Sequence, residues 1–110
     1  MSAHQYTPAR DNAQPIAEVV SVAAEGRLNT DPNSRAQSFI DVTLYFLPGG
    51  SLTIQGWAVL HESGKEPIVL PPGRKGERRY FPIVSLSGDI RRVIEQAVLK
   101  EYTRLRSAAE

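Results

Sequence analysis

Alternating apolar and polar residues mark two strands in the middle of the chain. In residues 38–47, SFIDVTLYFL, every second side chain is apolar, and a similar run, SLTIQGWAVL, follows at residues 51–60 after Pro48-Gly49-Gly50. Period-two alternation is typical of a strand with one buried face. Two such runs around a Gly-Gly turn predict a β-hairpin. The buried face of the first strand is expected to carry Ile40, Val42, Leu44 and Phe46.

Strict alternation along the second strand places its aromatic residue on the more polar side. One face would carry Leu52, Ile54, Ala58 and Leu60. The other would carry Trp57, on the same side of the sheet as Phe39 and Tyr45. Exposed aromatic rings on a sheet can stack on single-stranded bases, or they can be buried between subunits. Because one helix covers only one face of a sheet, we favour a dimer interface formed by Phe39, Tyr45 and Trp57.

Shorter apolar runs predict the remaining strands. They lie at residues 16–22, 68–70 and 79–84, and the proline in the last of them restricts that strand to an edge or an irregular position. Residues 23–37 are dense in Gly, Asn, Asp, Pro and Ser, so we expect a long hairpin loop there.

A three- and four-residue apolar spacing replaces the alternation near the C-terminus and predicts a helix. Ser87 is the expected N-cap, and Asp89 lies in the first turn, where an acidic group favours the helix dipole. The apolar stripe consists of Ile90, Val93, Ile94, Ala97, Val98, Tyr102 and Leu105. The predicted fold is α+β, with an antiparallel meander sheet of about five short strands followed by one C-terminal amphipathic helix. We expect residues 1–15 to form a flexible arm and residues 16–106 a single domain.

Composition excludes several function classes. The chain has no cysteine, and its two histidines, His4 and His61, lack the spacing of a zinc site. No apolar run is long enough for a membrane span or a secretory signal, so we expect a cytoplasmic protein without a membrane partner. His61-Glu62-Ser63 reads as a turn, and no phosphate-binding loop is present. We therefore expect no enzymatic activity, no small-molecule substrate, no cofactor and no metal.

Charge is distributed unevenly along the chain. The net charge is only +1, but residues 1–70 hold four basic side chains against seven acidic ones, whereas residues 71–106 hold nine against four. A local basic surface steers an anionic partner more strongly than the total charge does. The densest segment is LPPGRKGERRYFPI, residues 70–83, which is either a phosphate-contacting loop or a well-solvated connector. Its candidate contacts are Arg74, Lys75, Arg78 and Arg79.

Three polar residues on the helix would extend this surface. Arg92, Gln96 and Lys100 recur every four residues, and Arg92 has no acidic residue four positions later. Arg91 precedes Glu95 by four residues, so an ion pair within the helix accounts for it. A helix with Arg and Gln along one face can contact DNA.

The segment from residue 68 to residue 105 resembles the C-terminal half of the SpoVG family, bacterial proteins named for stage V of sporulation. The matching residues are Pro71, Arg74, Lys75, Gly76, Glu77, Phe81, Pro82, Ile83, Arg91 or Arg92, Ile94, Ala97, Val98, Leu99, Glu101 and Tyr102. Where family members have His, Asp or Arg in the third strand, this chain has Gln55-Gly56-Trp57. The resemblance implies a homodimeric regulator that binds DNA, and in some members RNA, with roles in septation or sporulation. The alternative is a protein-interaction module whose basic C-terminal segment binds an acidic protein.

Overall fold

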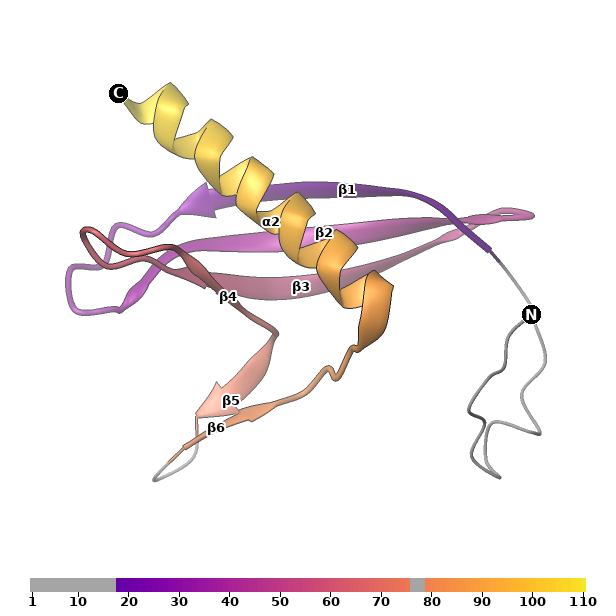
Figure 1. Ribbon diagram of the computed structural model, residues 1–110, viewed down its shortest axis with the longest axis horizontal. Helices are drawn as coiled ribbons and strands as arrows, with labels where there is room; N and C mark the ends of the chain where they lie inside the picture. The colour runs from indigo at the N-terminus through magenta and orange to yellow at the C-terminus, as the bar shows by residue number, and fades with distance from the viewer. Residues whose placement is uncertain (1–17, 76–78) are drawn as a thin grey trace.

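The computed structural model describes residues 18–75 and 79–110 of the chain. The elements follow the order β1 (Glu18–Leu28), β2 (Ala36–Leu47), β3 (Ser51–Leu60), β4 (Ile68–Leu70), β5 (Gly73–Lys75), β6 (Tyr80–Pro82) and α2 (Gly88–Ala109). The first four strands form an antiparallel sheet in chain order, and α2 crosses one face of it (Figure 1). The predicted α+β class is confirmed. The proposed arm of residues 1–15 lies outside the described residues.

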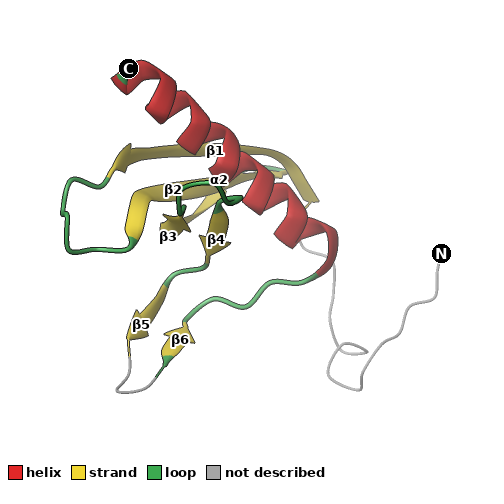
Figure 2. Ribbon diagram, turned by 60° about the vertical axis from the view of Figure 1, so that its left-hand side comes forward, coloured by secondary structure: helices red, strands yellow, loops and turns green. Residues whose placement is uncertain are grey.

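The strands differ from the expected meander in two places. β1 continues to Leu28, so much of the expected long loop is strand, and the connection to β2 is shorter than predicted. The run at residues 79–84 does not join the main sheet. Its strand, β6, pairs with β5 in a separate two-stranded ribbon that projects away from the sheet (Figures 1 and 2).

The hydrophobic core lies between α2 and one face of the sheet. Ile40, Val42 and Leu44 of β2 are buried there, as their alternation predicted. The helix contributes Ile94, Val98 and Tyr102 from its expected apolar stripe. Ser87 is the N-cap residue but makes no side-chain capping hydrogen bond. Within the described ranges, no helix is long and apolar enough to cross a membrane.

A β-bulge reverses the alternation in β3. Gln55 and Gly56 together face the single residue Asp41 of β2, and Gly56 adopts a φ of 88° that favours glycine. The Gly56 N–H donates a hydrogen bond of 3.0 Å to Asp41 Oδ1, which holds the bulge in place. The extra residue shifts the later part of β3 by one position. Trp57 and Val59 consequently face the core, and the predicted placement of Trp57 on the opposite face is wrong.

Candidate nucleic-acid interface

The β5–β6 ribbon presents the first part of the predicted basic surface. Arg74 lies opposite Phe81 in the ribbon, and both Arg74 and Arg79 are exposed. The ribbon is fixed at its base by a hydrogen bond of 2.8 Å from the Ile83 N–H to the Pro72 carbonyl oxygen. Neither arginine forms an ion pair with a residue that the structure describes. Among the described residues, no carboxylate competes with an anionic partner for either guanidinium group.

One of these arginines is held by an aromatic ring. The Arg79 guanidinium carbon lies 4.7 Å from the centroid of the Phe81 ring. A cation over the face of a ring is attracted by the ring's quadrupole, so the side chain is oriented before any partner binds. The other two predicted contacts are less defined, because the side chain of Lys75 and the whole of Arg78 lie outside what the structure describes.

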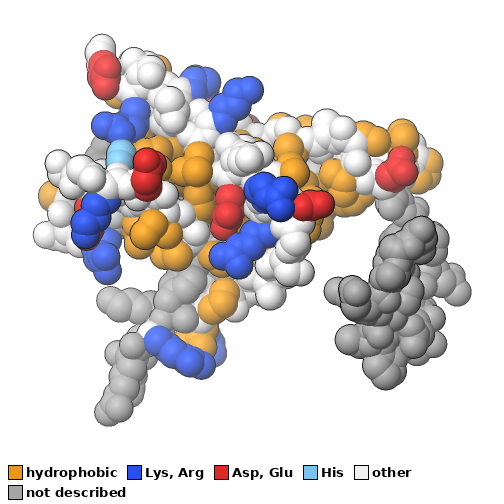
Figure 3. All heavy atoms as spheres, in the orientation of Figure 1, with side chains coloured by type: hydrophobic (Ala, Val, Ile, Leu, Met, Phe, Trp, Pro, Cys, Tyr) orange, Lys and Arg blue, Asp and Glu red, His pale blue; other side chains and the backbone are white. Residues whose placement is uncertain are grey.

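The helical residues Arg92, Gln96 and Lys100 contribute less unpaired positive charge than the sequence predicted. Arg92 has no acidic residue four positions later, as the sequence shows, but it pairs with Asp89, three residues earlier, at 2.9 Å. Arg91 pairs with Glu95 at 3.1 Å, as predicted. Gln96 and Lys100 are exposed. On the face shown in Figure 3, basic side chains over α2 and on the ribbon are separated by acidic and apolar ones. The described cations therefore form two groups and not one continuous basic patch.

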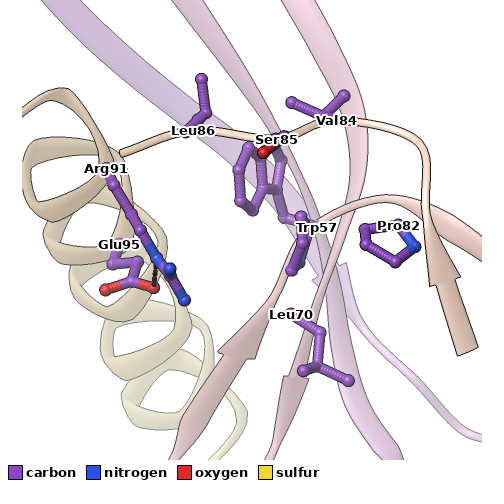
Figure 4. Close-up of a pocket in the computed structure, with 9 residues that line it drawn as sticks. Trp57, Leu70, Pro82, Val84, Ser85, Leu86, Arg91 and Glu95 are labelled. Carbon is purple, nitrogen blue, oxygen red and sulfur yellow. Dashed lines mark hydrogen bonds and ion pairs between the residues drawn. The ribbon is translucent and has the colours of Figure 1, made fainter. Parts of the chain in front are cut away.

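A cavity of about 300 Å³ separates the ribbon from the start of the helix. Its apolar wall includes Trp57, Leu70 and Val84, and the Arg91–Glu95 pair lines the helical side (Figure 4). The indole Nε1 of Trp57 is buried and has no hydrogen-bond partner among the described groups. The cavity thus lies beside the base of the ribbon, with a paired cation and anion at its edge.

The three aromatic residues predicted as a dimer interface do not share a face. Trp57 is 2% exposed and belongs to the core, because the bulge turns it toward the helix. Phe39 is half-buried on the opposite face, and the Arg27 guanidinium carbon lies 5.5 Å from its ring centroid. Tyr45 is exposed on that same face. The structure therefore leaves no set of three neighbouring rings for base stacking or for the predicted interface.

Sequence reasoning overlooked a polar cluster near the C-terminus of α2. Tyr102 Oη lies 2.8 Å from His61 Nδ1, and an Arg106 nitrogen lies 3.2 Å from the same His61 atom. The cluster ties the end of β3 to the last turns of the helix. The residues are 41 and 45 positions apart, so no local pattern could have paired them.

A second overlooked group is the buried carboxylate of Glu101. Its two oxygens accept hydrogen bonds from Arg104 Nε at 2.7 Å and Nη2 at 2.8 Å. These bonds lower the pKa of Glu101, burial opposes them, and a backbone hydrogen bond from Gly26 lowers the pKa further. Glu101 thus joins the helix to β1 as an anion.

This arrangement predicts a pH dependence of stability. Because the pKa of Glu101 is lower in the folded than in the unfolded chain, ionised Glu101 stabilises the fold above the unfolded value of about 4.3. That contribution is lost as the pH falls through the folded pKa. In urea unfolding, Glu101→Gln should be less stable than the parent chain at pH 7, and the difference should shrink below about pH 4.3. Glu62→Gln, at a more exposed ion pair, should show a smaller difference at every pH. A constant difference for Glu101→Gln would contradict the assignment.

A scan against protein-family models finds no match, and searches of curated proteins and of solved structures likewise find none. The resemblance to the SpoVG family stays a prediction from the residues that carry it.

Proposed function

We propose that the protein is a nucleic-acid-binding regulator of the SpoVG type, acting as a cytoplasmic homodimer, and that its β5–β6 ribbon contacts the nucleic acid. The observation that carries the proposal is the projecting ribbon with two exposed arginines, Arg74 and Arg79, that are free of described ion pairs. A two-stranded ribbon fits the major groove of duplex DNA, which is about 12 Å wide. The family's link to septation or sporulation is part of the same proposal.

The described aromatic residues favour duplex over single-stranded nucleic acid. Single-strand binding relies on open ring faces on which successive bases stack. Here Trp57 is buried, and the rings of Phe39 and Phe81 each have an arginine over one face. Arginines can instead contact phosphate oxygens or pair bidentately with guanine in a groove. Lys75 and Arg78 are further candidate contacts in the same segment as the ribbon. Gln96 and Lys100 would contribute contacts from α2, whereas Arg92 is held by Asp89.

The proposal predicts that the ribbon arginines set the salt dependence of binding. Fluorescence anisotropy of a labelled duplex over a salt series should give a linear fall of log K with log[salt]. In Arg74→Ala/Arg79→Ala the slope should decrease in magnitude by about 1.8, since each phosphate contact on duplex DNA contributes about 0.9. Single-stranded DNA and RNA measured in parallel should bind more weakly than the duplex.

The matched control is Arg35→Ala/Lys65→Ala, which removes two exposed cations that lie near Glu62, away from the ribbon. The control should keep the parental slope. If the ribbon variant also kept it, or if the parent chain bound no duplex even at low salt, the ribbon assignment would be wrong.

A protein-interaction module remains the second candidate. Ile83, directly after the ribbon, is 71% exposed, and Phe81 is also exposed. Apolar groups beside cations suit an acidic protein surface as well as a nucleic acid. This candidate predicts no salt-dependent binding to any nucleic acid in the same anisotropy series.

A further inference from the structure

The outer edge of β1 is not covered by another described strand. Among the described residues, β1 lies at the edge of the main sheet and pairs with β2 alone. Backbone groups of Arg27 and Asn29 point toward β2, since the Arg27 carbonyl oxygen accepts a bond from Ser38 Oγ at 2.7 Å and the Asn29 N–H donates to Gln37. In an antiparallel pair, alternate residues direct their N–H and C=O groups to the partner strand. The even-numbered residues of this stretch therefore point outward.

The contact between Gly26 and the helix agrees with this alternation. A backbone hydrogen bond links Gly26 to the Glu101 carboxylate, and the C-terminal half of α2 extends past β1 (Figure 1). Glu101 thus takes up the outward-pointing backbone group of Gly26. Inward-pointing charged residues are one of the ways in which proteins protect the edge of a sheet. The register continues without a break from Val22 to Leu28. Val22 and Ala24 therefore also turn their N–H and C=O groups to the open edge.

A groove runs beside these two residues, under the overhanging helix. It encloses about 320 Å³, and its lining residues are Val22, Ala24, Ala97, Lys100, Glu101 and Arg104. Val22, Ala24 and Ala97 make an apolar floor. Lys100 is exposed and forms no ion pair with a described residue, and the Arg104 side chain is 63% exposed although it pairs with Glu101. The groove therefore combines the unpaired edge of β1, an apolar floor, and a positively charged rim formed by Lys100 and Arg104.

We propose that an extended acidic segment of another protein adds to the edge of β1 as a further strand. Backbone bonds to Val22 and Ala24 would supply affinity, and alternate side chains of the added strand would enter the groove. An apolar side chain would pack on Ala24 and Ala97, and an acidic one would lie next to Lys100. The basic rim selects the charge of the partner.

A second copy of the chain fits this edge less well. Antiparallel pairing of β1 with its own copy places both overhanging helices on the same face of the joined sheet. The lysine and arginine of one rim would then approach those of the other. Like charges brought together across an interface disfavour that partner. The inference goes beyond the proposed function, and nucleic-acid binding by the ribbon is not needed for it.

Selection from a random dodecapeptide library, displayed on phage, tests the proposal. We expect enriched peptides in which apolar and acidic residues alternate. Titration of the isotope-labelled chain with a synthetic enriched peptide should shift the amide signals of Val22 and Ala24 and slow their hydrogen exchange. In the chain alone these two amides should exchange fast, because an edge already occupied would protect them. Protection without peptide, or shifts confined to the ribbon, would overturn the proposal.

Two variants remove the backbone and charge contributions separately. Ala24→Pro deletes an outward N–H without removing a bond to β2, a position where sheets tolerate proline. Lys100→Glu reverses the charge of the rim. Each should raise the dissociation constant of the peptide at least tenfold, whereas Lys65→Glu should leave that constant unchanged. Lys100→Glu keeps the test valid if the proline variant does not fold. The proposal would be contradicted if Lys100→Glu bound the peptide as tightly as the parent chain does, or if the selection enriched no peptide. It would also be contradicted if the parent chain dimerised and Ala24→Pro abolished the dimer.

Discussion

Replacing Trp57 with alanine should lower the free energy of unfolding by about 3–5 kcal/mol, the cost typical of truncating a large buried aromatic residue. The side chain is 2% exposed and lies in the same cluster as Ile40, Ile94 and Val98. Its removal would empty the space where helix and sheet meet. Equilibrium urea unfolding, followed by far-UV circular dichroism because the tryptophan is lost, measures the change.

Tyr45→Ala provides the control, because Tyr45 is 44% exposed on the other face of the sheet. It should cost less than about 1 kcal/mol, as surface substitutions usually do. If Trp57→Ala does not fold, Trp57→Phe gives a measurable intermediate: it removes the unpartnered Nε1–H and part of the ring. A loss for Trp57→Ala no larger than that for Tyr45→Ala would contradict the burial of Trp57.

Gly26→Ala should be the next most damaging substitution, at about 3 kcal/mol, the upper end of the usual cost of overpacking. A Cβ at residue 26 would be forced against the Phe39 carbonyl oxygen and would lie 2.8 Å from Ile40 Cα. Both are backbone atoms of β2, which cannot move aside as a flexible side chain can. The displaced strand would also weaken the bond between Gly26 and Glu101.

Gly49→Ala is a suitable control. Apart from its chain neighbours, no atom lies within 4 Å of the position that a Cβ would take at residue 49, and this residue does not have a positive φ. The substitution should change the urea midpoint little, or raise it slightly because alanine restricts the unfolded chain. Equal losses for the two alanine variants would show that strand β1 does not approach β2 as closely as described.

The sequence predicted those elements whose pattern is set by their own residues. The alternation in β2 and the helical stripe in α2 each identify a buried face directly, and the structure confirms both except for Val93, which is 40% exposed. β3 was mispredicted because its bulge depends on a contact between Asp41 and Gly56, 15 residues apart. Alternation assumes an unbroken strand, so Trp57 was assigned to the wrong side. The glycine before the tryptophan was the available signal, since a lone glycine in a strand pattern often marks a bulge.

The candidate interface was predictable to a similar extent. The cluster of cations between residues 74 and 79 is plain in the sequence, but only pairing between β5 and β6 shows that it sits on a projecting ribbon. Spacing of four residues pairs Arg91 with Glu95 but gives Arg92 no acidic partner, because its partner Asp89 lies three positions earlier. Glu101 could not have been identified as buried, because its environment comes from β1, more than 70 residues away.

The bulge at Gln55 and Gly56 gives β3 one place where its length can change without an exchange of faces. Trp57 pairs with Ile40 and Ile54 pairs with Val42, so removing one of the two bulge residues would restore strict alternation and leave Trp57 facing the helix. A deletion between Trp57 and Val59 would instead place these two core side chains on opposite faces of the sheet. Among relatives of this chain, a β3 that is one residue shorter should therefore lack the bulge and keep its tryptophan in the core.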